Sequence, residues 1–193
     1  MCGITGLINI DNKPVSIELL KRMTDSIAHR GPDAEGFWRD KGVGIGHRRL
    51  SIIDTTFNGN QPMCSKDGRY ILSYNGEIYN YKELKKELIS EGVIFSGNSD
   101  TEVLLNALIN WKESALLKFN GMFAFAFWDC KNESLFLARD RYGIKPLYYS
   151  IQGKTFAFGS EQKAITLTPN FKLDLNKSAL LEYFTFQNIF TDQ

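Results

Sequence analysis

Apolar segments that occur in pairs, each pair joined by a short polar turn, constrain the fold of this chain most strongly. Residues 122–129 (MFAFAFWD) and 134–140 (SLFLARD) are joined across a KNES turn, and residues 146–151 (PLYYSI) and 155–160 (TFAFGS) across Gln152-Gly153-Lys154. Short apolar runs separated by such turns predict β-hairpins. Because the two strands of a hairpin are antiparallel, the sequence predicts mainly antiparallel sheets.

The remaining elements fit an α+β layout rather than an alternating βαβ chain. Further strands are expected at residues 3–10, 35–39, 43–53 and 70–75, the last ending at Gly76. A helix is expected at 16–29 with Ser16 as its N-cap, and another after Asn80, which forms a capping-box pair with Glu83. A third helix begins near Thr101, and short helices are expected at 161–166 and 176–184.

Composition and charge narrow the class of protein. The chain has 193 residues, 43% of them hydrophobic, and a net charge of +1, which suits one buried domain and disfavours nucleic acid or an anionic membrane as partner. No apolar run approaches the roughly 20 residues that span a bilayer, and the start does not resemble a signal peptide. Three cysteines and two histidines without a C-x-x-C pair favour a cytoplasmic protein with no metal site.

Cys2 directly follows the initiator methionine. Excision of Met1 would make Cys2 the N-terminal residue, and its α-amino group could then accept the thiol proton and return it later to a leaving group. One residue would supply both nucleophile and general base. The alternative is a small apolar residue at a chain end with no catalytic role.

The NGEIYN segment (75–80) follows an apolar strand and precedes a helix. A glycine allows backbone N–H groups to approach a ligand closely, so Gly76 and the side-chain amide of Asn75 could form a two-donor oxyanion hole. A plain Asn-Gly turn, with Glu77 as a solvated carboxylate, is the alternative.

Two charged residues could bind a zwitterion. Arg49, in HRRLSIID (47–54), can hold a carboxylate through two hydrogen bonds, although a surface arginine is the commoner outcome for a single residue. Asp100, in SGNSDTEV, could bind an ammonium group, cap the helix that begins at Thr101, or do both. The SGNSD stretch lacks the second glycine of the Ser-Gly-Gly-x-Asp-Ser loop of ATP pyrophosphatases, so no ATP site is expected here.

Six motifs occur in a fixed order: MCGI, HRGPD (29–33), HRRLSIID, NGEIYN, SDTEV and RDRYGIKPLYY (139–149). Together they resemble the class II, or N-terminal-nucleophile, glutamine amidotransferases, and most closely the glutaminase domain of glutamine-hydrolysing asparagine synthetase. The resemblance covers residues 1–185, and residues 186–193 would begin a linker. It implies a four-layer α-β-β-α sandwich of two antiparallel sheets, the N-terminal-nucleophile hydrolase fold.

The resemblance also implies roles for individual residues. It makes Cys2 the nucleophile and Asn75 with Gly76 the oxyanion hole, while Arg30 supports the nucleophile. The glutamine-binding residues it implies are Arg49, Leu50, Ser51, Ile52, Ile53, Asn75, Gly76, Glu77 and Asp100. The reaction is hydrolysis of glutamine to glutamate and ammonia through a thioester on Cys2.

The implied partner is an ATP-dependent synthetase domain, in cis or in trans, that consumes the ammonia and carries the ATP and magnesium sites. No cofactor is expected in this chain, and a homodimer is possible in this family. The segment FGSEQKAI (158–165) departs from the family's Ala-Ser-Glu-x-Lys-Ala-Leu form at Gly159. The chain also ends just past the glutaminase core, which leads us to expect an excised domain or a stand-alone subunit.

Three alternatives stay open from the sequence. The same glutaminase could serve another acceptor, such as a sugar carboxylate. The domain could bind glutamine without turnover, or it could be an N-terminal-nucleophile hydrolase acting on another amide.

Overall fold

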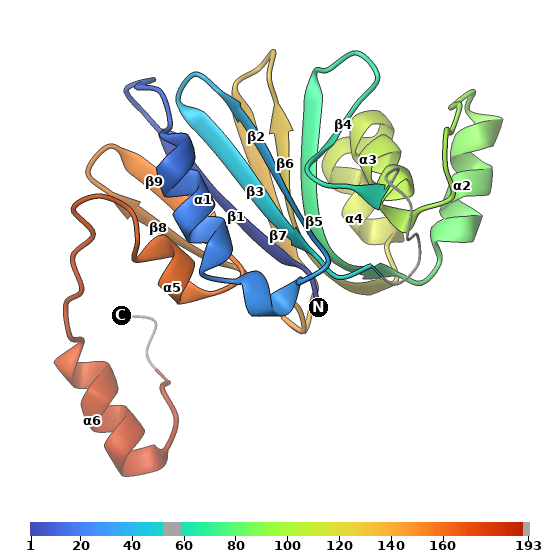
Figure 1. Ribbon diagram of the computed structural model, residues 1–193. Coiled ribbons are helices and arrows are strands. Elements are labelled where there is room, and N and C mark those ends of the chain that lie inside the picture. Colours follow the sequence, from blue (N-terminus) through green and yellow to red (C-terminus); the bar gives the residue numbers. More distant parts are fainter. Residues whose placement is uncertain (52–58, 191–193) are drawn as a thin grey trace.

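The computed structural model describes residues 1–51 and 59–190, and its described strands form two stacked antiparallel sheets (Figure 1). The strands are β1 (Gly3–Asn9), β2 (Ala34–Asp40), β3 (Val43–Arg49), β4 (Met63–Cys64), β5 (Tyr70–Ile78), β6 (Gly121–Asp129), β7 (Ser134–Arg139), β8 (Tyr148–Gln152) and β9 (Thr155–Gly159). The helices are α1 (Ile17–Asp25), η1 (Ala28–Arg30), α2 (Tyr81–Ser90), α3 (Asp100–Trp111), η3 (Lys112–Ser114), α4 (Ala115–Lys118), α5 (Gln162–Ile165) and α6 (Lys177–Phe186).

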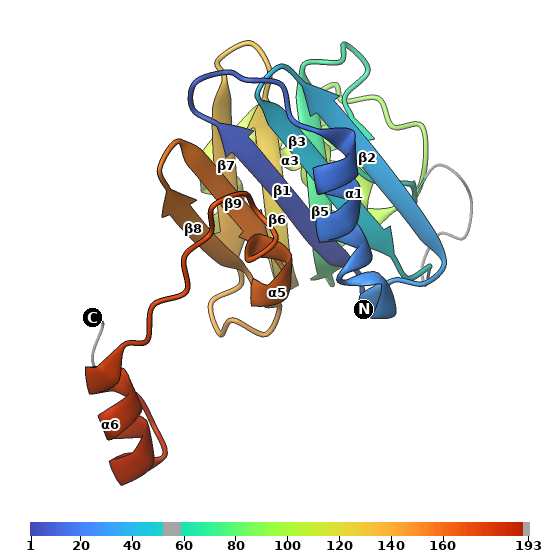
Figure 2. The same ribbon diagram turned by 60° about the vertical axis from the view of Figure 1, so that its left-hand side comes forward.

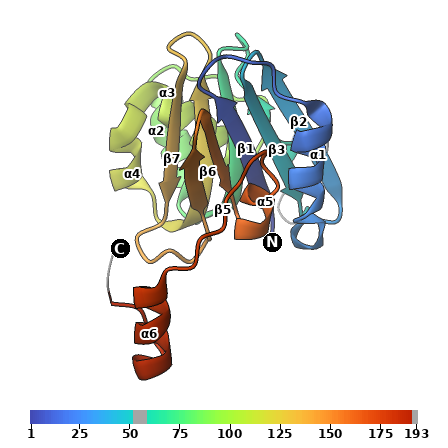
Figure 3. The same cartoon turned by 90° about the vertical axis from the view of Figure 1, so that its left-hand side faces the viewer.

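The first sheet has the order β2-β3-β1-β9-β8 and the second the order β4-β5-β6-β7. Helices α1 and α5 cover the outer face of the first sheet (Figure 2), and α2, α3 and α4 lie on the opposite side of the molecule, against the second sheet (Figure 3). This arrangement confirms the expected α+β class and the four-layer sandwich. Both hairpins expected from the turn chemistry are present, as β6–β7 and β8–β9.

Each interface between layers is filled by alternating apolar residues. Ile45 of β3, Trp128 of β6 and Phe158 of β9 pack between the sheets. Leu20 and Met23 of α1 pack against the first sheet. A fully buried side chain of this size stabilises the fold by about 1.5–3 kcal/mol, so these interfaces hold the strand ends that carry the candidate site.

Helix α1 and strand β3 end at Asp25 and Arg49 rather than at residues 29 and 53, and three further local predictions were wrong. Strand β5 continues through Gly76 to Ile78, because Glu77 and Ile78 pair with β6. Asn80 does not cap α2 through its side chain, which instead bonds the Lys118 carbonyl at 2.9 Å and the Asn120 N–H at 3.0 Å.

The last wrong prediction concerns the start of α3. Ser99 is its N-cap and accepts the Glu102 N–H at 3.2 Å, whereas Asp100 is its first helical residue. The Asp100 carboxylate accepts hydrogen bonds from Tyr74 and Ile78 instead of capping the helix. The predicted Ser16 cap of α1 is confirmed by its bond from the Leu19 N–H.

The C-terminal helix α6 stands away from the two sheets in all three views (Figures 1–3). Its apolar side chains include Leu181 and Phe184, which are 69% and 75% exposed. The domain boundary at residue 185 stays a prediction. Within the described ranges, no helix has both the length and the apolar character needed to cross a membrane.

Candidate active site

Cys2 immediately precedes β1, and its side chain is half-buried. The Leu50 N–H donates to Cys2 Sγ at 3.4 Å, and Sγ lies 3.7 Å from the Leu50 carbonyl oxygen, which a thiol can donate to. The backbone after β3 therefore holds the sulfur in position through both polar groups of Leu50.

Arg30, in η1, holds the backbone of Cys2. It donates from Nε to the Cys2 carbonyl at 3.0 Å and from Nη1 to Glu161 Oε1 at 3.1 Å. Glu161 also lies 2.8 Å from His29 Nε2 and 3.0 Å from Lys163 Nζ. Burial alone raises the pKa of Glu161, but hydrogen bonds from Lys163, Arg30 and His29 lower it to about 2. Glu161 is therefore ionised at neutral pH and neutralises the Arg30 charge.

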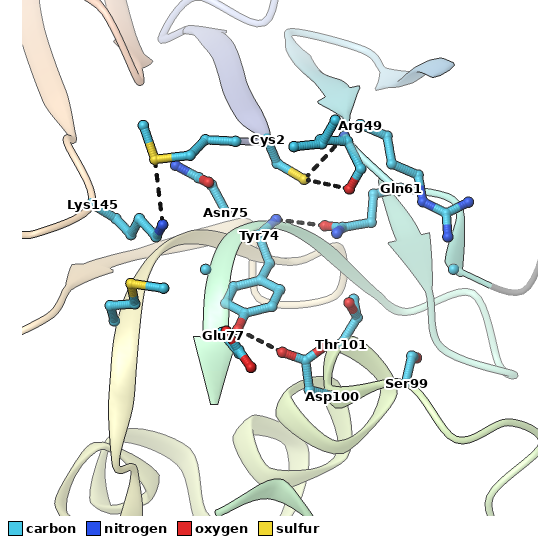
Figure 4. A pocket seen from close by; sticks show the side chains of 15 residues that line it. Cys2, Arg49, Gln61, Tyr74, Asn75, Glu77, Ser99, Asp100, Thr101 and Lys145 are labelled. Carbon is cyan, nitrogen blue, oxygen red and sulfur yellow. Dashed lines mark hydrogen bonds between the residues drawn. The ribbon is translucent and has the colours of Figure 1, made fainter. Parts of the chain in front are cut away.

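A cavity of about 120 Å³ lies beside the Cys2 thiol (Figure 4). Its wall comes from the ends of β3, β5 and β6, the start of α3 and the loop after β7. The described lining residues with polar or charged side chains are Cys2, Arg49, Gln61, Tyr74, Asn75, Glu77, Ser99, Asp100, Thr101 and Lys145. Met1 borders the same cavity, so its side chain occupies space next to the nucleophile.

Asn75 and Gly76 lie in β5, opposite Ala124 and Phe123 of β6. Asn75 is 1% exposed, and its Nδ2 has no acceptor within the described part of the chain. An unmatched buried donor costs about 1–3 kcal/mol, so the position suits an acceptor supplied by a ligand. A Cβ on Gly76 would lie 2.2 Å from the Met122 carbonyl oxygen, so only glycine fits there.

Two carboxyl groups lie toward the α3 end of the cavity (Figure 4). Asp100 Oδ2 accepts from the Tyr74 hydroxyl at 2.8 Å and from the Ile78 N–H at 3.2 Å. Burial raises the pKa of Asp100, and the hydrogen bonds from Tyr74 and Ile78 offset only part of this rise. Burial and the neighbouring Asp100 charge also raise the pKa of Tyr74 well above its usual value. Glu77 supplies the second carboxyl.

Arg49 ends β3, is 8% exposed, and donates from Nη1 to Asn60 Oδ1 at 2.8 Å. Two residues earlier, His47 is completely buried between the sheets. Burial first and the Arg49 charge second lower the pKa of His47 to about 3, so His47 is neutral over the physiological range.

Of the four predicted pocket residues at positions 50–53, the structure places one in the cavity wall. Leu50 lines the cavity. Ser51 is not among the described lining residues, and its N–H donates to Asp33 Oδ2 at 2.8 Å. The predicted residues Ile52 and Ile53 lie outside the described residues.

The sequence analysis missed several lining residues, among them Gln61 and Lys145. Gln61 Oε1 accepts the Tyr74 N–H at 2.6 Å and so connects the loop before β4 to β5. Lys145 is 6% exposed, and its Nζ lies 3.5 Å from Met1 Sδ. The RDRYGIKPLYY motif was a signal for Lys145, but the motif alone does not show that the side chain reaches the cavity.

Residues 1–51 and 59–190 contain no group of three or more His, Cys, Asp or Glu side chains arranged to hold a metal ion. The cavity brings together the Cys2 thiol, the side-chain amides of Gln61 and Asn75, and several charged side chains. A thiol beside an unmatched amide donor suits acyl transfer, in which a negative oxygen develops next to a nucleophile.

Comparisons with known proteins agree with this chemistry. A family model described as "Glutamine amidotransferase domain" matches residues 1–193. The chain is 45% identical over 190 residues to asparagine synthetase [glutamine-hydrolyzing] 1 of Bacillus subtilis, covering 97% of this chain and 30% of that protein. It is 41% identical over 177 residues to amidase chry2 of Gibberella zeae, covering 85% of this chain and 26% of that protein.

A solved structure gives the fold independently. The glutamine phosphoribosylpyrophosphate amidotransferase of B. subtilis, complexed with ADP and GMP, superposes with a TM-score of 0.72 at 23% identity. The match covers 86% of this chain and 43% of that one.

Proposed function

The chain belongs to the glutamine amidotransferase domain family, and from this premise we propose that it hydrolyses the side-chain amide of glutamine with Cys2 as nucleophile. One observation carries the proposal: the Cys2 thiol and the unmatched Nδ2 of Asn75 face the same cavity. The same cavity holds one guanidinium, that of Arg49, and the carboxyl groups of Glu77 and Asp100.

These charges match the polar end of glutamine. Arg49 would bind the α-carboxylate, since a guanidinium fork pairs well with a carboxylate. Glu77 and Asp100 would bind the α-ammonium group. When both charged groups of glutamine are bound, its neutral side-chain amide is free to reach the thiol. An amide without these charged groups would not be bound by Arg49, Glu77 and Asp100.

The reaction requires that Met1 be removed. The α-amino group of Cys2 then accepts the thiol proton, and the thiolate attacks the amide carbon. The oxygen of the tetrahedral intermediate is stabilised by Asn75 Nδ2 and the Gly76 N–H. The C–N bond breaks, the amine returns the proton, and ammonia leaves a thioester on Cys2. Water attacks the thioester, which releases glutamate and restores the thiol.

We further propose that the ammonia serves an ATP-dependent amidation of the asparagine-synthetase type. The chain spans 30% of the B. subtilis asparagine synthetase that it matches. A partner domain, in cis or in trans, would therefore carry the ATP and magnesium sites. The alternative is the same chemistry with a different acceptor, since the acceptor would contact the partner domain rather than this cavity. One relative, amidase chry2, does not carry the name of an asparagine synthetase.

Helix α6 offers a surface for that partner domain. It stands away from the sheets, and Leu181, Phe184, Phe186 and Phe190 are each more than 60% exposed. Exposed apolar side chains gathered on one short segment mark an interaction surface. A Leu181→Glu/Phe184→Glu variant should keep its glutaminase activity and lose glutamine-dependent transfer to the partner's acceptor. Unchanged transfer would exclude α6 as the docking surface.

Glutamate release from glutamine tests the main proposal. Wild-type protein with confirmed Met1 removal should release glutamate and ammonia in equal amounts, and Cys2→Ala should release neither. Both should retain the same melting temperature. If the wild type is as inactive as Cys2→Ala, with and without a partner domain, the domain binds glutamine without turnover and the proposal fails.

A further inference from the structure

Lys145 is a buried side chain in the same cavity as the Cys2 thiol, and among the described residues it has no ion-pair partner. The residue is 6% exposed, and within residues 1–51 and 59–190 its Nζ has a single acceptor, Met1 Sδ at 3.5 Å. A thioether is a weak acceptor. Lys145 and Asn75 both line the cavity, and the dashed line that ends at Lys145 in Figure 4 is its contact with Met1 Sδ.

The loop after β7 is built to hold this side chain in place. The Asp140 carboxylate accepts the N–H groups of Tyr142, Ile144 and Lys145 at 3.2, 2.9 and 2.9 Å, and that of Phe123 at 3.2 Å. Burial raises the pKa of Asp140, but these four backbone donors outweigh it and lower the pKa below its usual value. The RDRYGIKP motif thus forms a turn fixed by an ionised carboxylate, with Lys145 at its end.

Met1 is joined by its peptide bond to the nitrogen that becomes the α-amine of Cys2. The contact with Met1 Sδ therefore places Lys145 Nζ in the neighbourhood of this nitrogen. Removal of Met1 takes away the one acceptor that Lys145 Nζ has in the described part of the chain and frees the part of the cavity that the Met1 side chain fills. A cation held near an amine disfavours protonation of that amine.

We propose that Lys145 keeps the α-amino group of Cys2 in its unprotonated form at neutral pH, so that the amine can accept the thiol proton. The inference rests on the proposed function, since it requires Cys2 to be N-terminal. Lys145 acts through Cys2 rather than on glutamine, and it is therefore a positioning residue.

Other charges around Cys2 do not replace this effect. The Arg30 charge is neutralised by Glu161, at 3.1 Å. Arg49 and the two carboxyl groups of Glu77 and Asp100 are the groups assigned to the ends of glutamine. In the free enzyme those two carboxylates favour an ammonium form of the amine, and Lys145 opposes them. The titratable groups that line the cavity with Lys145 are Cys2, Arg49, Tyr74, Glu77 and Asp100. Arg30, with its partner Glu161, contacts the Cys2 backbone, and Asp140 contacts the Lys145 backbone.

The test uses Lys145→Met, which removes the charge and keeps the length, and Lys145→Arg, which keeps the charge. Lys145→Gln is a second neutral variant in case Lys145→Met does not fold. Lys154→Met is the matched control, because it removes an exposed lysine from the β8–β9 turn. Intact mass establishes Met1 removal in every protein.

Two readouts are measured against pH. The first is kcat/KM for glutamine, and the second is alkylation of Cys2 by iodoacetamide, followed on the N-terminal peptide. In the neutral variants, the acid limb of both profiles should shift to higher pH by about one pH unit. Activity at pH 6.5 should fall about tenfold and recover at alkaline pH, while Lys145→Arg and Lys154→Met should follow the wild type.

Acid limbs that coincide with the wild type, or a loss of activity that is equal at every pH, would overturn the inference. Alkylation does not depend on turnover. If the wild type proves inactive on glutamine, the proposed function fails, and the alkylation profile still decides the effect of Lys145 on Cys2.

Discussion

Arg30 donates from Nε to the Cys2 carbonyl at 3.0 Å, which ties the backbone of the nucleophile to a side chain 28 residues later in the chain. Glu161 fixes that guanidinium at 3.1 Å. The backbone of the nucleophile is thereby held by an ion-paired guanidinium.

Glu161→Gln should lower kcat about tenfold with little change in KM, because it loosens Arg30 without touching the glutamine pocket. Lys163→Met is the matched control, since Lys163 pairs with the same carboxylate but is 51% exposed. Steady-state kinetics on both variants measure this. A Glu161→Gln enzyme with wild-type kcat would show that the ion pair does not position Cys2.

Asn75→Leu should separate stability from activity. The substitution removes a buried donor that has no acceptor in the described part of the chain, so the free energy of unfolding should stay equal or increase. The same change removes an oxyanion donor and should lower kcat by about 10²- to 10³-fold. Denaturant unfolding and glutamate release measure the two effects. A variant that is both destabilised and active would contradict the role of Asn75.

The sequence predicted the layers better than the contacts within the site. Apolar alternation and turn residues are local, and they located both hairpins and the helix that Ser16 caps. The capping role of Asp100 was wrong because Ser99 fits the same cap, and only the tertiary partner Tyr74 shows where the carboxylate is used. Lys145 could not be placed either, because its approach to Met1 joins residues 144 positions apart.

Arg49→Met should raise the KM for glutamine by about 100-fold or more, because it removes a charge-assisted pair with the α-carboxylate. Its kcat should change less, since Arg49 does not reach the reacting amide. A useful control is a substrate that keeps the side-chain carboxamide of glutamine but lacks the α-carboxylate. Wild type and Arg49→Met should have the same low kcat/KM for this compound. An unchanged KM would place the carboxylate site elsewhere.

His47 should make the fold sensitive to acid. Its pKa is lowered to about 3 by burial and by Arg49, so between pH 6.5 and pH 3 the unfolded chain binds a proton that the folded chain does not. The contribution of His47 to the free energy of unfolding is therefore fully present above pH 6.5. It falls by up to about 1.4 kcal/mol per pH unit as the pH drops through this window. A His47→Met variant should lose this part of the slope in denaturant unfolding. An identical slope in both proteins would contradict the assignment.

The state of the Cys2 amine tests the central claim most directly. The protein can be prepared with Met1 removed or, under inhibition of methionine aminopeptidase, with Met1 retained, and the two forms can be distinguished by intact mass. Glutamate release is then measured for each form at equal concentration. The account predicts activity only in the form that begins with Cys2, because an amide nitrogen cannot accept the thiol proton. Full activity in the form that retains Met1 would contradict it.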